Sequence, residues 1–204
     1  MSDDSVRTFA VGITGASGAV YAARTVAALL TDGAHVNLVV SDLGRRLLRD
    51  ELGSEATIGR LQTYLADRYG DTVQRGQLVV LSNKDVGATI ASGSYPCDGM
   101  VIVPCSMKTL AGVANGLSRN LIERAADVML KEKRRLIIVP RETPMSLPQL
   151  RNMVLCAEAG MLVMPAMPAF YQKPHSLDDL ADFMAGKILS ALGVEHELYP
   201  VWTG

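Results

Sequence analysis

The 204-residue sequence has few cysteines, few aromatic residues and almost no net charge. Cys97, Cys105 and Cys156 form neither a Cys-x-x-Cys pair nor a Cys/His cluster with metal-ligand spacing, which argues against a disulfide framework and a structural metal. The formal net charge is −1, from 20 basic and 21 acidic residues. This balance gives no electrostatic reason to expect nucleic acid or a membrane surface as a partner. An anionic ligand would have to be held by a local site.

Targeting signals are also lacking. The N-terminal residues MSDDSVRTF carry acids where a signal peptide carries cations followed by an apolar core. The most membrane-like stretch, 154–171, is interrupted by Glu158, Gly160, Pro165 and Pro168, so we expect a buried helix, a turn and a strand there. Together with reduced thiols, these features predict a cytoplasmic protein.

Short apolar runs recur along the chain, at 9–13, 36–40, 100–103 and 136–139, with weaker runs at 78–81 and 162–164. Such runs are typical of strands buried on both faces of a parallel sheet. Between them lie segments with helical spacing, of which 177–192 is the clearest: Ser176 and Asp179 form an N-terminal capping pattern and Gly193 stands at the C-cap. The alternation predicts an α/β fold with one doubly wound parallel sheet. We expect one domain over 1–204, with 194–204 as a tail.

The first predicted strand runs into a glycine turn. Gly12, Gly15 and Gly18 are spaced three apart, Thr14 and Ser17 offer hydroxyl donors, and a helix is expected to begin near residue 19. Glycines let backbone N–H groups approach a phosphate, and a helix N-terminus favours negative charge. The turn therefore favours a nucleotide phosphate over the alternative, a tight strand-to-helix turn without a ligand.

The nucleotide is not expected to be a nicotinamide cofactor. The second strand ends at Ser41 and Asp42; Ser41 is small and suits a packed ligand, whereas Asp42 fits an ordinary helix N-cap. No tyrosine has a lysine four residues later, so the Tyr-x-x-x-Lys pair of short-chain dehydrogenases is absent from the sequence.

Polar side chains follow four of the predicted strands, where ligands bind in open α/β sheets. Hydroxyls, a lysine and a guanidinium around one crevice suit a phosphate and the polar edge of a ring. For Thr109 taken alone, an N-cap is the simpler interpretation. The residues at the four strand ends are Ser17, Ser41, the group Ser106, Lys108 and Thr109, and the pair Arg141 and Glu142.

Other charged residues have ordinary explanations at this level. Arg124 and Lys131 share one helical face with Asp127, which could form a solvated ladder of ion pairs. Lys187 stands one turn after Phe183, where a surface lysine is common. Glu51 would by default be a surface acid.

Six segments resemble the UbiX-type flavin prenyltransferase family, and the resemblance covers nearly the whole chain, 7–202. The long blocks at 120–144 are the most specific, and the glycine turn alone would not identify the family. The segments are TGASGA (14–19), VVSDLG (39–44), ASGSYP (91–96), PCSMKTLAGVANG (104–116), NLIERAADVMLKEKRRLIIVPRETP (120–144) and PAMPAFYQKP (165–174).

The resemblance implies a flavodoxin-like Rossmann variant that binds FMN. It implies transfer of a dimethylallyl unit from dimethylallyl phosphate to reduced FMN at N5 and C6, without a metal. The prenylated FMN would pass to a UbiD-type decarboxylase, and the enzyme would be a large homo-oligomer with shared sites.

The same resemblance implies roles for individual residues. FMN would be held by Gly15, Ala16, Ser17, Ser41, Ser106, Met107, Lys108, Thr109 and Arg141. Dimethylallyl phosphate would be bound by Arg124, Lys131, Arg141, Tyr171 and Lys187, with Trp202 as an aromatic wall. Ser17, Glu51 and Glu142 would handle protons.

Two other functions remain open from the residues. An FMN-dependent cysteine decarboxylase shares the fold, but His35, His175 and His196 are not placed at a suitable strand end for its catalytic histidine. A non-catalytic FMN carrier would have no use for a second set of phosphate-binding cations.

Overall fold

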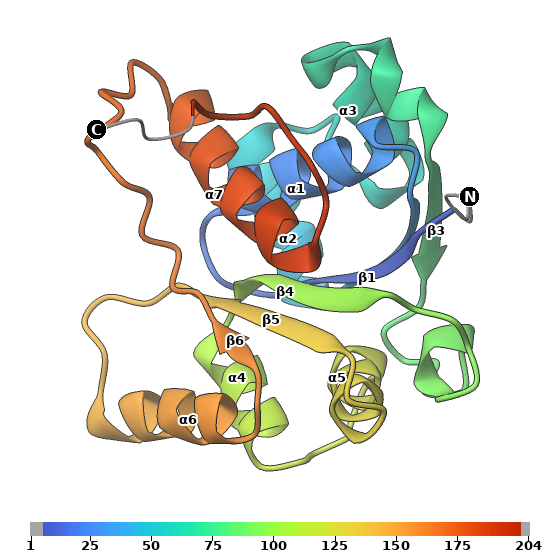
Figure 1. Cartoon of the computed structure of the whole chain (residues 1–204), viewed down its shortest axis with the longest axis vertical. Coiled ribbons are helices and arrows are strands. Elements are labelled where there is room, and N and C mark those ends of the chain that lie inside the picture. Colours follow the sequence, from blue (N-terminus) through green and yellow to red (C-terminus); the bar gives the residue numbers. More distant parts are fainter. Residues whose placement is uncertain (1–5, 201–204) are drawn as a thin grey trace.

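The computed structural model describes residues 6–200 as one α/β domain. Six parallel strands form a single sheet in the order β3-β2-β1-β4-β5-β6. The chain therefore winds outward from β1 in one direction, then returns to the other side of β1 with β4 (Figure 1). The strands are β1 (Thr8–Ile13), β2 (His35–Val40), β3 (Gln77–Leu81), β4 (Gly99–Cys105), β5 (Arg135–Pro140) and β6 (Leu162–Val163).

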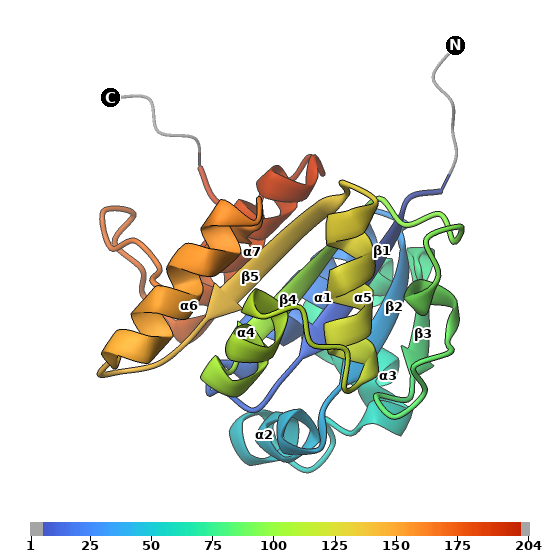
Figure 2. The same cartoon turned by 90° about the horizontal axis from the view of Figure 1, so that it is seen from below.

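Helices cover both faces of this sheet. On one face α1 packs against α7, with α2 and α3 beside α1; on the other lie α4, α5 and α6 (Figures 1 and 2). Three short 3-10 turns, η1 (Ile58–Arg60), η2 (Asp71–Arg75) and η3 (Thr89–Ala91), connect the elements between β2 and β4. The helices are α1 (Ala19–Thr31), α2 (Asp42–Leu52), α3 (Leu61–Tyr69), α4 (Met107–Ala114), α5 (Leu121–Lys131), α6 (Leu147–Glu158) and α7 (Leu177–Leu192).

The doubly wound parallel sheet predicted from the apolar runs is confirmed. All six runs form strands, and the central ones, β1 and β4, are buried along almost their whole length. Helix α7 has the expected capping box between Ser176 and Asp179, and Gly193 ends it in the left-handed conformation at φ 77°. In the described residues, no helix is long and apolar enough to cross a membrane.

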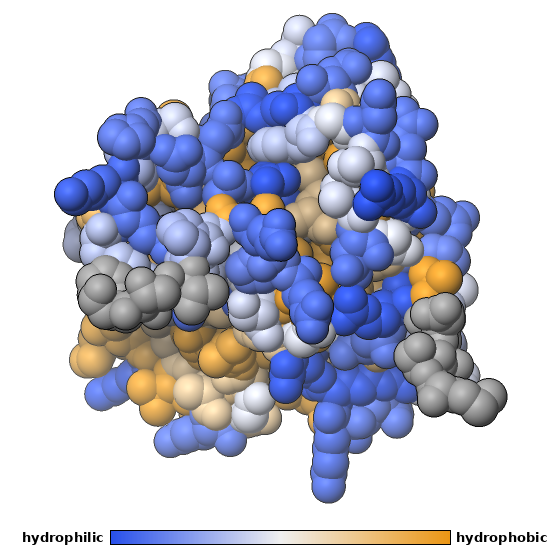
Figure 3. Space-filling model, turned by 45° about the horizontal axis from the view of Figure 1, so that its top comes forward, coloured by the Kyte–Doolittle hydropathy of each residue, from blue (hydrophilic) through white to orange (hydrophobic). Residues whose placement is uncertain are grey.

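The prediction of a buried helix within 154–171 is wrong. The helix there is α6, and Cys156 is its one buried residue. Its apolar side chains point outward instead, and with those of β6 and the following segment they form an apolar surface (Figure 3). This α6–β6 surface comprises Leu147, Leu150, Val154, Leu155, Leu162, Met167 and Phe170.

Candidate functional site

The glycine turn after β1 is tied to the end of β4, its neighbour in the sheet. The buried Thr14 hydroxyl donates to the Pro104 carbonyl at 2.8 Å and accepts the Ser106 N–H at 2.7 Å. Its hydroxyl is therefore already used within the protein, and the expectation that Thr14 offers a donor to a ligand is wrong. Ser17 is exposed in the same turn. The crevice between β1 and β4 lies where the strand order reverses, which is the usual ligand position in such sheets.

Helix α2 lies across the carboxyl ends of the strands (Figure 2). Its N-cap is Ser41, whose Oγ accepts the Gly44 N–H at 3.1 Å, so the cap is not Asp42. Gly15 is required beside it, because a Cβ there would lie 2.5 Å from the Cβ of Leu43. The glycine turn and α2 are thus packed at van der Waals contact.

Glu51, near the C-terminal end of α2, reaches the N-terminus of α1. Its Oε2 accepts the N–H groups of Gly18 at 2.9 Å and Ala19 at 2.7 Å. The helix N-terminus stabilises a negative charge there, so Glu51 has a defined position despite its exposure. Glu51 is thus a surface acid, as expected, but its carboxylate is bound to the turn one residue from Ser17.

A second helix begins at the same edge of the sheet. The N-cap of α4 is Ser106, whose Oγ accepts the Thr109 N–H at 3.3 Å and bonds the Thr109 hydroxyl at 3.1 Å. Thr109 is therefore the capped residue and not the cap. Met107 is buried against the core, whereas the Lys108 side chain is exposed. The N-terminus of α4 presents backbone donors and hydroxyls to the crevice.

The segment after β5 completes this edge. Arg141 is exposed, and its guanidinium makes no hydrogen bond or ion pair with another residue of the described chain. Tyr21, in the first turn of α1, lies close enough to interact with that charge: burial raises the pKa of Tyr21, and Arg141 partly opposes the increase. Glu142 is half-buried and accepts the N–H of Thr143 at 3.1 Å. Arg141 and Glu142 thus stand beside the glycine turn.

The two cations Arg124 and Lys131 lie toward opposite ends of α5. Arg124 pairs with Asp127 at 2.7 Å, as the predicted ladder requires, but Lys131 pairs with Glu132 and not with Asp127. The N-terminus of α5 is at the carboxyl edge of the sheet, where Leu121 N–H bonds the Asn83 carbonyl after β3. Lys131 is at the opposite end of the helix, about 10 Å along the axis from Arg124. It therefore lies near the amino edge of the sheet.

Tyr171 and Lys187 belong to the other face of the molecule. The exposed Tyr171 ring packs edge-on against Phe183 of α7, with ring centroids 6.2 Å apart. Lys187 follows Phe183 by one turn and is exposed. Because α5 and α7 cover opposite faces of the sheet, Lys131 and Lys187 do not converge within one chain (Figure 1). Trp202 lies outside the described residues.

The chain therefore brings together one part of the predicted site and separates the rest. The crevice at the carboxyl edge, here called the carboxyl-edge crevice, collects Gly15, Ala16, Ser17, Ser41, Glu51, Ser106, Met107, Lys108, Thr109, Arg141 and Glu142. Arg124, Lys131, Tyr171 and Lys187 are distributed over two helical layers.

Two structural contributors were missed by the sequence reasoning. Glu123, only 2 % exposed, accepts three hydrogen bonds from Arg119 at 2.8–3.1 Å and packs on Gly112 of α4. Arg134 donates to the carbonyls of Gly93 and Tyr95. The i,i+4 spacing of Arg119 and Glu123 could have shown the first pair. The second joins residues about forty positions apart, for which the sequence carries no local signal.

The histidines do not form a catalytic centre at a strand end. His35 is the first residue of β2, at the amino edge of the sheet, and His175 precedes the N-cap of α7. His196 bonds the hydroxyl of Ser190, near the C-terminal end of α7, at 2.8 Å. Among residues 6–200, no group of three or more His, Cys, Asp or Glu side chains is arranged to hold a metal ion.

Comparison with known proteins decides the family. The Flavoprotein family model matches residues 1–189. A flavin prenyltransferase UbiX of Halalkalibacterium halodurans is 48 % identical over 194 residues, which are 95 % of this chain and 92 % of that protein. The chain belongs to the UbiX-type flavin prenyltransferases. The resemblance inferred from the motifs is thereby confirmed.

Solved structures of flavin prenyltransferases and their relatives share the fold over their whole length. AnUbiX (PadA1), crystallised with FMN and dimethylallyl pyrophosphate, is 36 % identical, covers 98 % of each chain and superposes with a TM-score of 0.87. A dodecameric FMN-dependent UbiX-like decarboxylase of Escherichia coli O157:H7 is 35 % identical, with a TM-score of 0.84, over 97 % of this chain and 100 % of that one. The flavodoxin-like fold of this family is thus established for the chain.

Proposed function

We propose that this flavin prenyltransferase transfers a dimethylallyl group from dimethylallyl phosphate to N5 and C6 of reduced FMN, and that a UbiD-type decarboxylase uses the prenylated product. The observation that carries the proposal is that three further cations, Arg124, Lys131 and Lys187, lie on α5 and α7 in addition to Arg141, which stands beside the glycine turn. One FMN phosphate does not require these cations in addition to Arg141. A second phosphate, that of an allylic donor, would require them.

The carboxyl-edge crevice fits FMN. The exposed Ser17, the N-termini of α2 and α4, and the unpaired guanidinium of Arg141 offer hydroxyl, N–H and cationic donors around one opening. Gly15 allows α2 to pack directly against the turn, because a Cβ there would lie 2.5 Å from the Cβ of Leu43. The residues that would hold FMN are Gly15, Ala16, Ser17, Ser41, Ser106, Met107, Lys108, Thr109 and Arg141.

The reduced flavin would supply the nucleophilic atoms N5 and C6. The protein would supply positive charge for the leaving phosphate and acceptors for the protons released from the flavin. When the allylic C–O bond breaks, the electron pair leaves with the phosphate, so Arg124, Lys131, Arg141 and Lys187 would stabilise the growing dianion. Tyr171 and Trp202 would cover the allylic group with aromatic surface and exclude water.

Proton movement is assigned to Ser17, Glu51 and Glu142. Forming the bonds at N5 and C6 would release one proton from each atom, and the second bond would consume the allylic double bond, whose middle carbon would take up one proton, so that one proton in total is released. The Glu51 carboxylate is fixed by Gly18 and Ala19 one residue from Ser17 and remains exposed toward the opening. Its second oxygen makes no hydrogen bond with the described residues, so it is available to accept a proton through Ser17.

The dispersed cations require that several copies of the chain build one site. Lys131 and Lys187 lie on opposite faces, so a neighbouring subunit would bring its α5 or α7 to the crevice. The α6–β6 surface is suited to this assembly, because Phe170, Met167 and Leu147 are 70 %, 66 % and 58 % exposed in the single chain. We propose a large cytoplasmic homo-oligomer in which each chain is one FMN-binding domain and residues 194–204 form a tail.

The experiment is anaerobic incubation of the purified protein with reduced FMN and dimethylallyl phosphate, followed by mass spectrometry of the released flavin. We expect a flavin heavier by one prenyl unit with the monophosphate or the pyrophosphate donor. Lys131→Ala and Tyr171→Phe should slow transfer and leave FMN bound. An unmodified flavin with both donors would favour the carrier or the cysteine decarboxylase function, and a protein without flavin would contradict the crevice assignment.

A further inference from the structure

The segment between η3 and β4 forms an ordered loop against the C-terminal end of α5. Arg134 donates one guanidinium nitrogen to the Tyr95 carbonyl at 2.8 Å and another to the Gly93 carbonyl at 2.7 Å. The Ser92 and Ser94 hydroxyls bond each other at 2.9 Å across the same loop. One half-buried cation thus fixes two carbonyls two residues apart, a geometry that the planar guanidinium fork allows.

The far side of the loop is attached to the sheet. The Tyr95 hydroxyl accepts the side-chain N–H of Asn37 at 3.1 Å, and Asn37 is buried on β2. Residues 92–95 are therefore held from two directions, by α5 through Arg134 and by β2 through Tyr95. The loop position is defined relative to the core.

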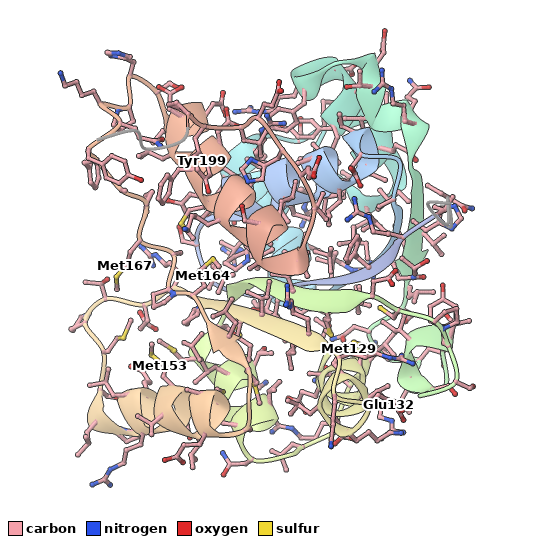
Figure 4. The ribbon with its side chains drawn as sticks, viewed as in Figure 1. Met129, Glu132, Met153, Met164, Met167 and Tyr199 are labelled. Carbon is pink, nitrogen blue, oxygen red and sulfur yellow. The ribbon has the colours of Figure 1, made fainter. Side chains whose placement is uncertain are left out.

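Lys131 lies directly on this loop. A Cβ on Gly93 would overlap the Glu132 carboxylate and lie 2.8 Å from Lys131 Nζ. Lys131 and Glu132 form an ion pair at this contact, and Glu132 lies at the end of α5 near the η3 segment (Figure 4). The ammonium group is thus bounded by a glycine backbone on one side and a carboxylate on the other.

We propose that Arg134 is a positioning residue for the phosphate of the prenyl donor, acting through the 92–95 loop on Lys131. The inference rests on the proposed function, in which Lys131 binds that phosphate. Lysine is a flexible point charge, and by itself it does not define an anion position. The loop that Arg134 holds supplies the surface against which the ammonium is placed.

The test compares Arg134→Gln with Arg135→Gln in the full-length enzyme. Both substitutions remove one positive charge at neighbouring positions, but Arg135 bonds the Ala191 carbonyl at the end of α7 and does not touch the loop. Arg134→Gln should raise the KM for dimethylallyl monophosphate about tenfold, with kcat and the dissociation constant of FMN changed less than about twofold. Arg135→Gln should behave as wild type, and Arg134→Lys should be intermediate.

Gly93→Ala tests the same contact without changing a charge. The methyl group should displace the ends of Glu132 and Lys131, which are flexible, so we expect a stable protein with a raised donor KM. An unchanged donor KM in Gly93→Ala or in a folded Arg134→Gln, while Lys131→Ala raises it, would overturn the inference and leave the function intact. An unchanged KM in Lys131→Ala itself would instead remove the phosphate role assigned under the proposed function.

Discussion

The two edges of the sheet carry different parts of the proposed site. At the carboxyl edge Thr14 links the turn after β1 to the end of β4 and the start of α4, and the Glu51 carboxylate of α2 accepts N–H groups at the start of α1, so this region is assembled within one chain. Toward the amino edge Lys131 and Lys187 are held on separate helices of opposite layers. A fold of this kind preorganises a nucleotide crevice at one edge only.

This difference between the edges indicates where each of the two proposed ligands, the flavin and the phosphate of the prenyl donor, would bind. The flavin crevice depends on backbone geometry and short-range packing, which a single domain provides. In the proposed function, the donor phosphate would be bound by long cationic side chains on α5 and α7, which would converge only between copies of the chain. Substitutions that affect one edge alone test this division.

The largest effect is expected when the edges are inactivated in different subunits. Glu51→Gln keeps an oxygen that can accept the Gly18 N–H but removes the carboxylate, and Lys131→Ala removes the ammonium at the other edge. Each homogeneous variant should lose prenyl transfer on the order of 100-fold. If sites are shared, co-expressed mixed oligomers should recover about a quarter of wild-type activity, because that fraction of sites receives both intact edges.

Tandem affinity tags on the two variants isolate the mixed oligomers for this assay. Co-expression of two differently tagged Glu51→Gln chains is the matched control and should remain inactive. Mixed oligomers no more active than the two parents would show that both edges act within one chain, against the geometry of α5 and α7.

The next effect concerns the surface that would bring the edges of different chains together. Leu150→Glu places a charge in the α6–β6 surface, where burial of an unpaired carboxylate is costly. We expect smaller particles by light scattering, loss of prenyl transfer and retention of the monomer fold by circular dichroism. Leu177→Glu is the control, because Leu177 is 75 % exposed in the first turn of α7 and lies outside this surface. Unchanged particle size in Leu150→Glu would exclude this surface from assembly.

The sequence predicted the sheet well because buried parallel strands are continuous apolar runs with a local signature. It failed for α6, whose hydrophobic residues resemble those of a core helix such as α7; the difference is that α7 packs on α1 while the apolar side of α6 faces outward. Composition does not distinguish burial within a chain from burial between chains. Met153, Met164 and Met167 show the same ambiguity: the first two are half-buried and Met167 is exposed (Figure 4).

For the site, the motifs named the residues but not their arrangement. Ser41 and Ser106 follow strands, so their place at the carboxyl edge could be predicted from the sequence. The contact of Glu51 with α1 could not, because it depends on the direction in which α2 crosses the sheet. The same holds for Arg134, whose partners are set by the packing of η3 on α5.

A smaller effect is expected from the buried contact that closes the carboxyl-edge crevice. Thr14→Val keeps the shape of the side chain but removes the bonds to the Pro104 carbonyl and the Ser106 N–H. The lost bonds and the buried groups left unpaired should lower the free energy of unfolding by about 1–3 kcal/mol. FMN affinity should fall as well, while the donor KM stays within twofold or so of wild type. Chemical denaturation and flavin fluorescence measure these quantities, and a weakened donor affinity with unchanged FMN affinity would contradict the division between the edges.

The smallest effect is a pH dependence at the link between the two regions. Glu123 connects α4, which begins at the crevice, to α5, which carries Lys131. Burial disfavours its charged form, but the hydrogen bonds and charge of Arg119 outweigh that cost, and the pKa of Glu123 is lowered from its usual value. The ionised carboxylate therefore stabilises the folded state above the unfolded pKa of about 4.3, and this contribution is lost as the pH falls through the lower folded pKa.

Denaturant titrations from pH 7 to pH 3.5 should show that Glu123→Gln is less stable than wild type by about 1–2 kcal/mol at neutral pH, with a difference that narrows in acid. Glu158→Gln, an exposed carboxylate at the end of α6, is the control that should show no such convergence. A difference that stays constant over this range would mean that Glu123 contributes by packing on Gly112 and not by its charge.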